Sequence, residues 1–234
     1  GTLNLLEAMR ASGCGQLVFS SSATVYGHPE RCPVREDAPV GAINPYGRTK
    51  LMMEQAIADL VAADDSFHAV TLRYFNPAGA HPSGRLGELP RGAPNNLVPF
   101  VAQVAAGVRP EVQVFGHDYA TVDGTGVRDY IHVMDLAQAH VSALHYLERT
   151  ATSLTVNLGT GRGYSVLEII QAFSDACGHA VPYRLVGRRP GDTDACFADP
   201  SVAEQHLYWR AEHDLARICT DAWRWEQHLR AAQG

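Results

Sequence analysis

Leu17-Val18-Phe19-Ser20-Ser21-Ser22 is a short apolar run that closes on three hydroxyl side chains. A run of this length is typical of a buried strand. Upstream of it, Leu3, Leu6 and Met9 recur at helical spacing, and two glycines then supply a helix stop. The sequence therefore predicts a helix that leads into a buried strand, with Ser22 at the strand's C-terminal tip.

A second helix and a second strand follow. Residues 70–75, VTLRYF, form another apolar, β-branched run, and a helix is predicted to begin after Pro45. The core face of that helix is assigned to Leu51, Ile57, Leu60 and Val61. A helix–strand–helix–strand order of this kind predicts an α/β fold with a parallel, doubly wound sheet, whose ligands lie beyond the strand C-terminal ends.

The composition changes after residue 75. Residues 76–96 are rich in Pro, Gly and charged side chains, and they form a loop too long for a simple connector. We place a domain boundary there. A second α/β region is predicted beyond it, with helices at 97–106, 135–147, 165–177 and near the C-terminus, and strands at 112–115, 127–133, 155–158 and 183–186.

Composition and charge exclude several classes of protein. The 234 residues are 46% hydrophobic, enough for a full core, and the formal net charge of −6 argues against nucleic-acid and acidic-membrane partners. The sequence contains no apolar run of ~18 residues and no basic-then-apolar leader. We therefore expect neither a membrane span nor export, and cytoplasmic localisation is the default prediction.

Cysteine and histidine spacing indicates neither disulfides nor a metal centre. The five cysteines are scattered with no CxxC pair, and the eleven histidines include no HExxH motif. Reduced thiols and no metal are expected.

Tyr46 and Lys50 are the candidate catalytic pair. They lie four residues apart in the predicted helix, so they share one face and the ammonium can sit beside the phenol. A nearby ammonium and a cationic nicotinamide ring would favour the phenolate of a tyrosine whose ordinary pKa is about 10. Ser22, at the adjacent strand tip, can then hydrogen-bond the same substrate oxygen and relay its proton. This trio suits proton removal coupled to hydride transfer, although the YxxxK spacing alone occurs by chance on many helices.

Three longer motifs carry a family resemblance. They are FSSSATVYG at 19–27, NPYGRTK at 44–50 and LRYFNP at 72–77. Together they resemble the extended short-chain dehydrogenase/reductase family and, within it, the UDP-glucose 4-epimerases. The likeness runs from the first residue to about Gln227. It implies NAD as the cofactor, a UDP-sugar as the substrate and a homodimer as the assembly.

The implied reaction is epimerisation at carbon 4 of UDP-hexoses, UDP-galactose and UDP-glucose, through a transient 4-keto intermediate. In the family, the half of the Rossmann-type sheet that carries the phosphate-binding glycine loop lies upstream. The chain opens within a helix pattern and without a methionine, so we interpret it as an N-terminally truncated piece whose first sheet half is missing. Residues 1–75, rejoined by about 127–158, are then the C-terminal part of a dinucleotide-binding domain, and 76–234 a smaller substrate domain.

The resemblance assigns roles around the cofactor. Tyr46 is the base, Lys50 holds the nicotinamide ribose, Ser22 relays the proton, and Phe75 and Tyr74 lie at the nicotinamide. For the two aromatic residues, ordinary core packing at a strand end is an equally good interpretation.

The substrate side needs cations, because a nucleotide diphosphate carries about two negative charges and guanidinium groups match phosphate oxygens. Arg128 and Arg189 fit that need, although an isolated arginine on a strand is more often a surface ion-pair partner. The resemblance assigns both to the diphosphate. It further assigns contacts with the nucleotide-sugar to Asn76, Asn96 and Leu97. The resemblance also places Phe115 on the strand beside the uracil and Asp192 at the uridine ribose.

Cys196 bears on substrate size. It corresponds to a position where family members carry either a bulky tyrosine or a smaller side chain, and the bulky version excludes a 2-acetamido group. We hypothesise that Cys196 leaves room for UDP-N-acetylhexosamines. The alternative is a small buried cysteine with no gating role.

Two other functions were weighed. A nucleotide-sugar 4,6-dehydratase needs an extra acid and base after the strand-tip hydroxyl, where this sequence has Ala23 and Thr24. The other possibility is a catalytically inactive fragment, because a parallel sheet cut in half exposes an apolar edge and lacks the pyrophosphate grip.

Overall fold

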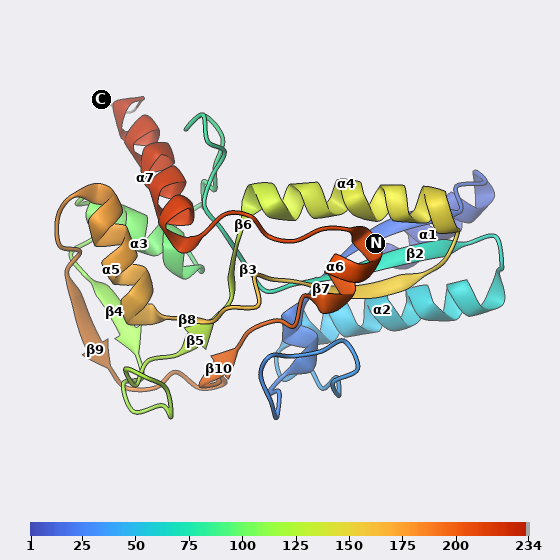
Figure 1. Cartoon of the computed structure of the whole chain (residues 1–234), viewed down its shortest axis with the longest axis horizontal. Helices are drawn as coiled ribbons and strands as arrows, with labels where there is room; N and C mark the ends of the chain where they lie inside the picture. The colour runs from blue at the N-terminus through green and yellow to red at the C-terminus, as the bar shows by residue number, and fades with distance from the viewer. Residues whose placement is uncertain (233–234) are drawn as a thin grey trace. The chain divides into compact units, whose positions relative to one another are not determined.

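The computed structural model describes residues 1–232, which form two compact units (Figure 1). The first unit comprises residues 1–75, 137–161 and 198–210, and the second comprises 76–136, 162–197 and 211 onwards. The chain leaves the first unit after Phe75 and returns to it twice, the second time with 198–210. The sequence predicts a single return, over about 127–158. The dinucleotide and substrate roles of the units stay predictions.

A three-stranded parallel sheet forms the centre of the first unit. Its strands are β1 (Gln16–Ser22), β2 (His68–Tyr74) and β7 (Leu154–Leu158), in the order β1-β2-β7. The register pairs Ser22 with Tyr74, and Tyr74 with Leu158, so all three strands end at the same level. The predicted α/β class with a parallel sheet is confirmed.

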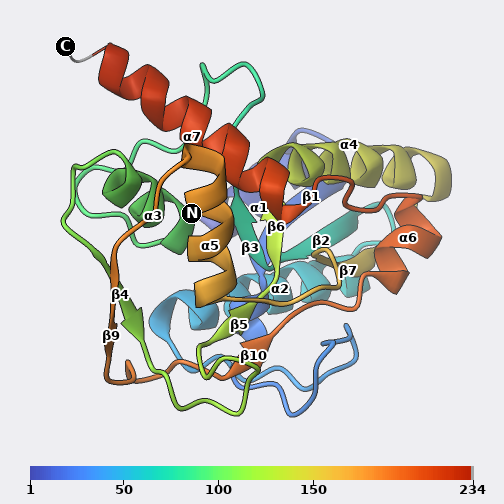
Figure 2. The same cartoon turned by 60° about the vertical axis from the view of Figure 1, so that its left-hand side comes forward.

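Helices cover both faces of this sheet. Figures 1 and 2 show α4 (Val133–Thr150) along one face and α2 (Pro45–Ala63) along the other. On the α2 side, α1 (Thr2–Ala11) contributes Leu6 and Met9 to a buried cluster with Ile57 of α2. The short helices η1 (Ala23–Tyr26) and α6 (Ser201–Leu207) complete the unit.

The second unit contains three small sheets. β4 (Val112–Phe115) pairs with β9 (Tyr183–Val186), and β3 (Asn76–Ala78) pairs with β6 (Tyr130–His132), both in parallel. The third sheet has the order β10-β5-β8, formed by Ala195–Cys196, Val127–Arg128 and Tyr164–Ser165.

The single strand predicted over 127–133 is wrong. The chain is interrupted at Asp129, which is fully buried, so β5 and β6 belong to different sheets. The Asp129 N–H donates to the carbonyl of Cys196 at 3.3 Å, and the Asp129 carbonyl accepts from the N–H of Asn76 at 2.9 Å. Asp129 therefore connects two sheets through its backbone.

Three helices pack around the core of the second unit. They are α3 (Leu97–Ala105), α5 (Val166–Cys177) and α7 (Leu215–Ala231), and Val101, Phe173 and Ile218 are fully buried among them. A capping box starts α5, where the Ser165 hydroxyl accepts from the Glu168 N–H and the Glu168 carboxylate accepts from the Ser165 N–H.

A buried charged network joins α7 to the strand end at His132. The Met134 N–H donates to His132 Nδ1 at 3.0 Å, so the ring proton lies on Nε2, which donates to Asp221 Oδ2 at 3.3 Å. Arg217 and Arg224 bind the same carboxylate at 2.6 and 2.9 Å. The buried carboxylate of Asp221 is thus neutralised from the surface side of α7.

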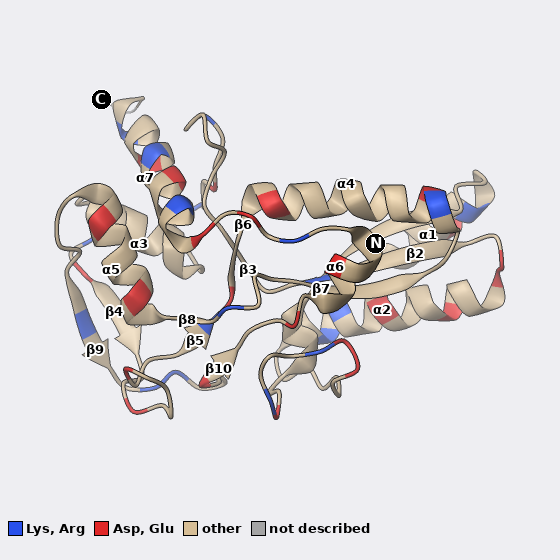
Figure 3. Ribbon diagram, in the orientation of Figure 1, with Lys and Arg blue, Asp and Glu red and all other residues tan. Residues whose placement is uncertain are grey.

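Among the described residues 1–232, no helix is both long and apolar enough to cross a membrane. No group of three or more His, Cys, Asp or Glu within that range is placed to hold a metal ion. Basic and acidic side chains are interspersed along both units (Figure 3).

Candidate functional site

The start of α2 sets the position of Tyr46. Asn44 caps the helix, since its side-chain oxygen accepts from the Gly47 N–H at 2.7 Å, and Pro45 occupies the first helical position. Tyr46 follows in the first turn and is 56% exposed. A rigid, well-capped helix start therefore presents an accessible phenol.

Gly47 brings this first turn close to the tip of β1. A Cβ atom at Gly47 would lie 2.7 Å from the carbonyl oxygen of Thr24, a backbone atom that has no freedom to rotate away. Thr24 is two residues beyond Ser22. The absence of a side chain at Gly47 is what lets the Tyr46 turn pack against the segment that follows Ser22.

Lys50 lies beside the phenol and is held from behind. Its Nζ is 5.7 Å from the centre of the Tyr46 ring and 5.3 Å from that of Phe19. The same Nζ donates to the backbone carbonyl of Ser20 at 2.7 Å. The ammonium is therefore oriented by a strand residue rather than left free in solvent.

Ser22 ends β1 and begins η1. Its Oγ accepts hydrogen bonds from the N–H of Thr24 at 3.2 Å and from the Thr24 hydroxyl at 3.0 Å. Both contacts use the lone pairs of Oγ, so the Ser22 proton is left to donate. The side chain predicted to relay a proton thus has its donor available.

A buried ion pair that no sequence motif indicated fixes α2 to the sheet. Arg73 of β2 binds Glu54 of α2 at 2.7 Å, with both side chains about nine-tenths buried, and Ser21 also donates to Glu54. Gly47, Lys50 and Glu54 are spaced at i, i+3 and i+7, which places them on one face of the helix. This spacing places Glu54 on the sheet-facing side of the helix, but it does not identify Arg73 as its partner.

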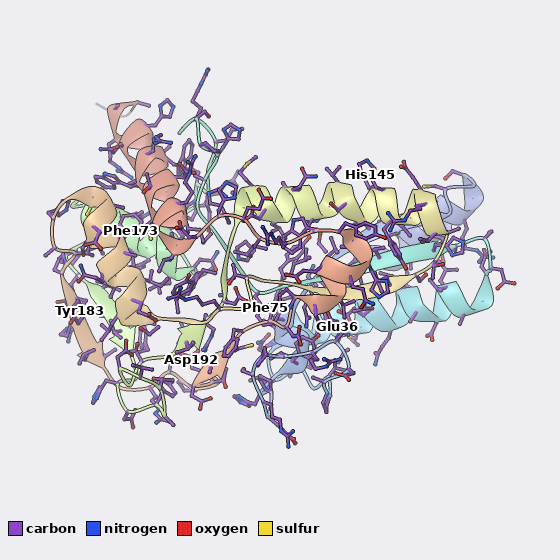
Figure 4. The ribbon with its side chains drawn as sticks, viewed as in Figure 1. Glu36, Phe75, His145, Phe173, Tyr183 and Asp192 are labelled. Carbon is purple, nitrogen blue, oxygen red and sulfur yellow. The ribbon has the colours of Figure 1, made fainter. Side chains whose placement is uncertain are left out.

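Tyr74 is the last residue of β2 and Phe75 comes directly after it, at the strand end that the sequence predicts. Phe75, labelled in Figure 4, is only 7% exposed. The Tyr74 hydroxyl contacts Ser20 Oγ and His140 Nε2, each at 2.5 Å. Burial raises the pKa of Tyr74 and outweighs the hydrogen bond with Ser20, which lowers it, so Tyr74 stays protonated. His140 was not predicted as a functional residue.

A pocket of about 330 Å³ lies within the second unit. It brings together residues from β3, α3, β4, β5 and the segment between β9 and β10. Seven of the predicted substrate residues line it: Asn76, Asn96, Leu97, Phe115, Arg128, Arg189 and Asp192.

Arg189 lines this pocket and is held by two neighbouring side chains. It forms two hydrogen bonds with Asp192, at 3.1 and 3.2 Å, and its guanidinium carbon lies 5.3 Å from the centre of the Phe115 ring. The pair remains accessible, with 58% of the Arg189 side chain exposed. Figure 4 labels Asp192 in the segment that leads to β10, and Figure 3 shows both signs of charge along it.

The N-terminus of α3 adds a second source of positive potential. Asn96 is the N-cap residue but makes no side-chain cap, because its amide instead donates to Glu88 at 3.3 Å, and Leu97 opens the helix. Unpaired N–H groups at a helix start attract anions. Arg128 contributes a further guanidinium, which donates to the Val127 carbonyl at 2.8 Å.

Cys196 is not among the residues that line the pocket. It lies on β10 and pairs with Arg128 of β5. Its side chain is partly buried. The structure thus places Cys196 next to a pocket residue rather than in the pocket wall.

The comparisons with known proteins cover nearly the whole chain. Residues 1–222 match the family model described as GDP-mannose 4,6 dehydratase. The UDP-glucose 4-epimerase of Bacillus subtilis (strain 168) is 57% identical over 226 residues, which cover 97% of this chain and 67% of that protein. The chain therefore spans about two thirds of the length of the curated relatives it matches.

Solved structures give the same picture. A UDP-glucose 4-epimerase from Stenotrophomonas maltophila, with bound NAD and formylated UDP-arabinopyranose, superposes with a TM-score of 0.97 at 57% identity and covers 99% of this chain and 69% of its own. The UDP-Glc/GlcNAc 4-epimerase from Campylobacter jejuni gives 0.81 at 38% identity, over 97% of this chain and 69% of its own. With this identity and coverage, the chain belongs to the UDP-glucose 4-epimerase family, within the group that the GDP-mannose 4,6 dehydratase model describes.

Proposed function

We propose that the protein catalyses NAD-dependent epimerisation at carbon 4 of UDP-hexoses, interconverting UDP-galactose and UDP-glucose. The observation that carries this proposal is the Lys50 ammonium, which lies 5.7 Å from the Tyr46 ring and is anchored on the Ser20 carbonyl. An accessible phenol beside a fixed cation is suited to act as a base.

The residues divide the chemistry among themselves. Tyr46 accepts the proton of the 4-hydroxyl group, and Lys50 stabilises the phenolate. Ser22 donates to the same substrate oxygen and relays the proton. When bound, NAD would supply the hydride acceptor and donor at carbon 4, so that the reaction would pass through a transient 4-keto sugar without net oxidation.

The side chains of the first unit fit NAD. Lys50 has further ammonium protons to donate to a ribose hydroxyl, because Ser20 uses one of three. Tyr46 is open to solvent, so a planar ring can approach it. Phe75 is buried and Tyr74 is engaged with Ser20 and His140, so we propose that these two shape the wall of the cofactor site rather than bind through polar groups.

The pocket of the second unit is proposed to hold the UDP portion. Arg128, Arg189 and the N-terminus of α3 offer positive potential for the diphosphate. Phe115 offers an aromatic face to the uracil, and Asp192 offers carboxylate oxygens to the ribose hydroxyls. Asn76, Asn96 and Leu97 complete the contacts with the nucleotide-sugar.

We further propose that UDP-N-acetylhexosamines are substrates, because Cys196 is small and is the strand-pairing neighbour of Arg128, which lines the pocket. The relative from Campylobacter jejuni is described as acting on both kinds of sugar. Cys196→Tyr is expected to abolish turnover of the N-acetyl sugar while sparing UDP-galactose. Equal loss of both activities would refute the gating role.

A 4,6-dehydratase is the alternative, since the matching family model carries that description. Ala23 and Thr24 follow Ser22, and Thr24 is engaged with Ser22 through both its N–H and its hydroxyl. Neither side chain exchanges protons in the way that water elimination needs. Appearance of a 4-keto-6-deoxy sugar from UDP-glucose would favour the dehydratase.

The catalytic test is Tyr46→Phe. In the full-length protein and in the presence of NAD, conversion of UDP-galactose to UDP-glucose, followed by NMR, is expected to fall by about 10²- to 10⁴-fold, the usual contribution of a general base. Tyr208→Phe is the matched control, because Tyr208 is 78% exposed outside the site. Full activity in Tyr46→Phe would overturn the mechanism.

The binding test is calorimetric titration with UDP. Arg189→Ala is expected to weaken binding by roughly tenfold or more, the weight of a charge-assisted hydrogen bond. Arg184→Ala on β9, an exposed arginine outside the pocket, should leave affinity unchanged. Equal affinities for UDP in the two variants would show that the pocket does not bind the diphosphate.

Homodimerisation stays a prediction, and light scattering measures the oligomeric state that checks it.

A further inference from the structure

We propose that His140 is a positioning residue for Lys50 and acts through Tyr74 and Ser20. Three side chains from α4, β2 and β1 form a closed hydrogen-bonded cluster. His140 Nε2 lies 2.5 Å from the Tyr74 hydroxyl and 3.5 Å from Ser20 Oγ, and the Tyr74 hydroxyl lies 2.5 Å from Ser20 Oγ. The backbone carbonyl of this same Ser20 accepts the proton of Lys50 Nζ at 2.7 Å.

The alternation of the strands explains why the cluster forms. Successive side chains of a strand point to opposite faces of the sheet. Ser20 and Tyr74 therefore face α4, whereas Ser21 and Arg73 face α2, where both contact Glu54. The part of β1 that receives Lys50 is fixed from both faces at once.

His140 Nε2 is one of two polar partners of the Tyr74 hydroxyl, and Ser20 Oγ is the other. Burial keeps the Tyr74 phenol protonated, so it offers one hydrogen and two lone pairs. Tyr74 can satisfy Ser20 or His140 as a donor while accepting from the other. Removing the imidazole leaves a partly buried phenol with a single polar neighbour, and Ser20 loses the contact that limits its rotation. The carbonyl that holds Lys50 is then less well fixed.

The rings add a second constraint. Tyr74 and His140 have centroids 5.5 Å apart and planes inclined by 59°, a tilted aromatic contact. A purely space-filling role for His140 is the competing explanation. The two explanations make different predictions for the Tyr74 hydroxyl. Only the hydrogen-bonding role predicts that removing this hydroxyl affects Lys50 in the same way as removing the imidazole of His140.

The sequence provides a direct probe, since Lys50 is its only lysine. In a polypeptide of residues 1–234, reductive methylation with ¹³C-formaldehyde labels just two amines, Lys50 Nζ and the α-amine of Gly1, and NMR resolves them. Gly1 is exposed and serves as the internal reference. The ratio of the two labelling rates reports how firmly Nζ is held and requires no catalytic turnover.

The variants separate hydrogen bonding from packing. His140→Leu and Tyr74→Phe are each expected to raise the Lys50 rate relative to Gly1 by about fivefold, the effect of losing one hydrogen bond of typical strength. His140→Gln keeps a polar group at similar reach and should remain within about twofold of the unsubstituted protein. His145→Leu is the control, because His145 is an exposed residue of the same helix (Figure 4).

The proposal is overturned if Tyr74→Phe leaves the labelling ratio unchanged in a folded protein, or if His140→Gln raises it as much as His140→Leu does. An equal rise in His145→Leu would also overturn it. If His140→Leu fails to fold, Tyr74→Phe and His140→Gln decide the question.

The inference rests on the proposed function in one respect, which is the role of Lys50 as the cation beside the catalytic base Tyr46. The two fail differently. Loss of the hydrogen-bonded cluster appears in the labelling ratio, whereas a wrong activity appears when Tyr46→Phe keeps full turnover. A positive labelling result together with no epimerisation would leave the positioning intact and remove the function.

Discussion

The strand-tip site of the first unit and the pocket of the second unit use charge in opposite ways. In the first, Glu54 and Arg73 are about nine-tenths buried and bind each other, which fixes a helix to a sheet. In the second, Arg189 and Asp192 are paired but 58% and 21% exposed. Buried charge sets geometry, and accessible charge remains available to a ligand. Substitutions should therefore damage stability in the first site and binding in the second.

Arg73→Leu should have the largest effect on stability. It leaves the Glu54 carboxylate buried without its cation, and breaking one partner of a buried pair costs about 3–5 kcal/mol. Denaturant unfolding followed by circular dichroism measures the loss. Arg184→Leu, which breaks the exposed pair with Glu111, should cost at most about 1 kcal/mol. Similar losses in both variants would erase the contrast between the regions.

Gly47→Ala should come next. Alanine favours a helix interior by about 1 kcal/mol over glycine, yet the new methyl group meets the Thr24 carbonyl at 2.7 Å. Overpacking of this kind costs about 1–3 kcal/mol, so we expect net destabilisation and a lower rate of epimerisation. Thermal unfolding and turnover are the measurements. A stabilised and fully active variant would show that the first turn of α2 adjusts freely.

His132 gives the second unit a pH-dependent stability of its own. Burial lowers the pKa of His132, and His213, stacked at 4.4 Å, lowers it further, while Asp221 and Asp135 oppose the shift. A depressed folded-state pKa stabilises the fold above the unfolded pKa of about 6.5. That contribution is lost as the pH falls from there through the folded value.

The expected result is a free energy of unfolding that decreases between pH 7 and pH 5, and a smaller decrease in His132→Leu. Arg217 and Arg224 also face Asp221 from α7, and neither titrates in this range. His145→Leu changes an exposed histidine, so its free energy of unfolding should show the same pH dependence as that of the unsubstituted protein. Parallel curves for His132→Leu and the unsubstituted protein would place the pH dependence elsewhere.

Phe115→Ala should have the smallest effect on stability and a clear effect on binding. The ring is 38% exposed and faces Arg189, so the change in unfolding free energy should stay within about 0.5 kcal/mol. Affinity for UDP should fall by the equivalent of about 1–3 kcal/mol, as for other base–aromatic stacks. Calorimetry on the same preparation checks both. An unchanged affinity for UDP would show that the uracil does not contact Phe115.

The sequence predicted those parts of the fold that depend on local pattern. The apolar runs before Ser22 and before Phe75 became neighbouring parallel strands, and the proline at position 45 marked the start of α2. The interruption at Asp129 was missed because it depends on Asn76 and Cys196, which pair with it from distant segments. No local pattern encodes such partners.

The candidate sites show the same division. Tyr46, Lys50 and Ser22 were found because their spacing is short and their chemistry is specific. His140 was missed because it lies 66 residues from its partner Tyr74, in a helix whose histidines looked unremarkable. Glu54 was missed because its role appears only once Arg73 is known to be buried. Contacts across sheet faces require the fold before they can be identified.

The alternating side chains of β1 also limit what its length can be. Deleting one residue ahead of Ser20 would rotate every later side chain to the other face. Ser21 would then take the place of Ser20 beside His140, Ser22 would take the place of Ser21 beside Glu54, and Ala23 would take the place of Ser22 at the strand tip. A single-residue deletion in this strand would thus keep a hydroxyl on each face of the sheet but remove the one at the strand tip, and we expect natural variants of the protein to keep this segment at constant length.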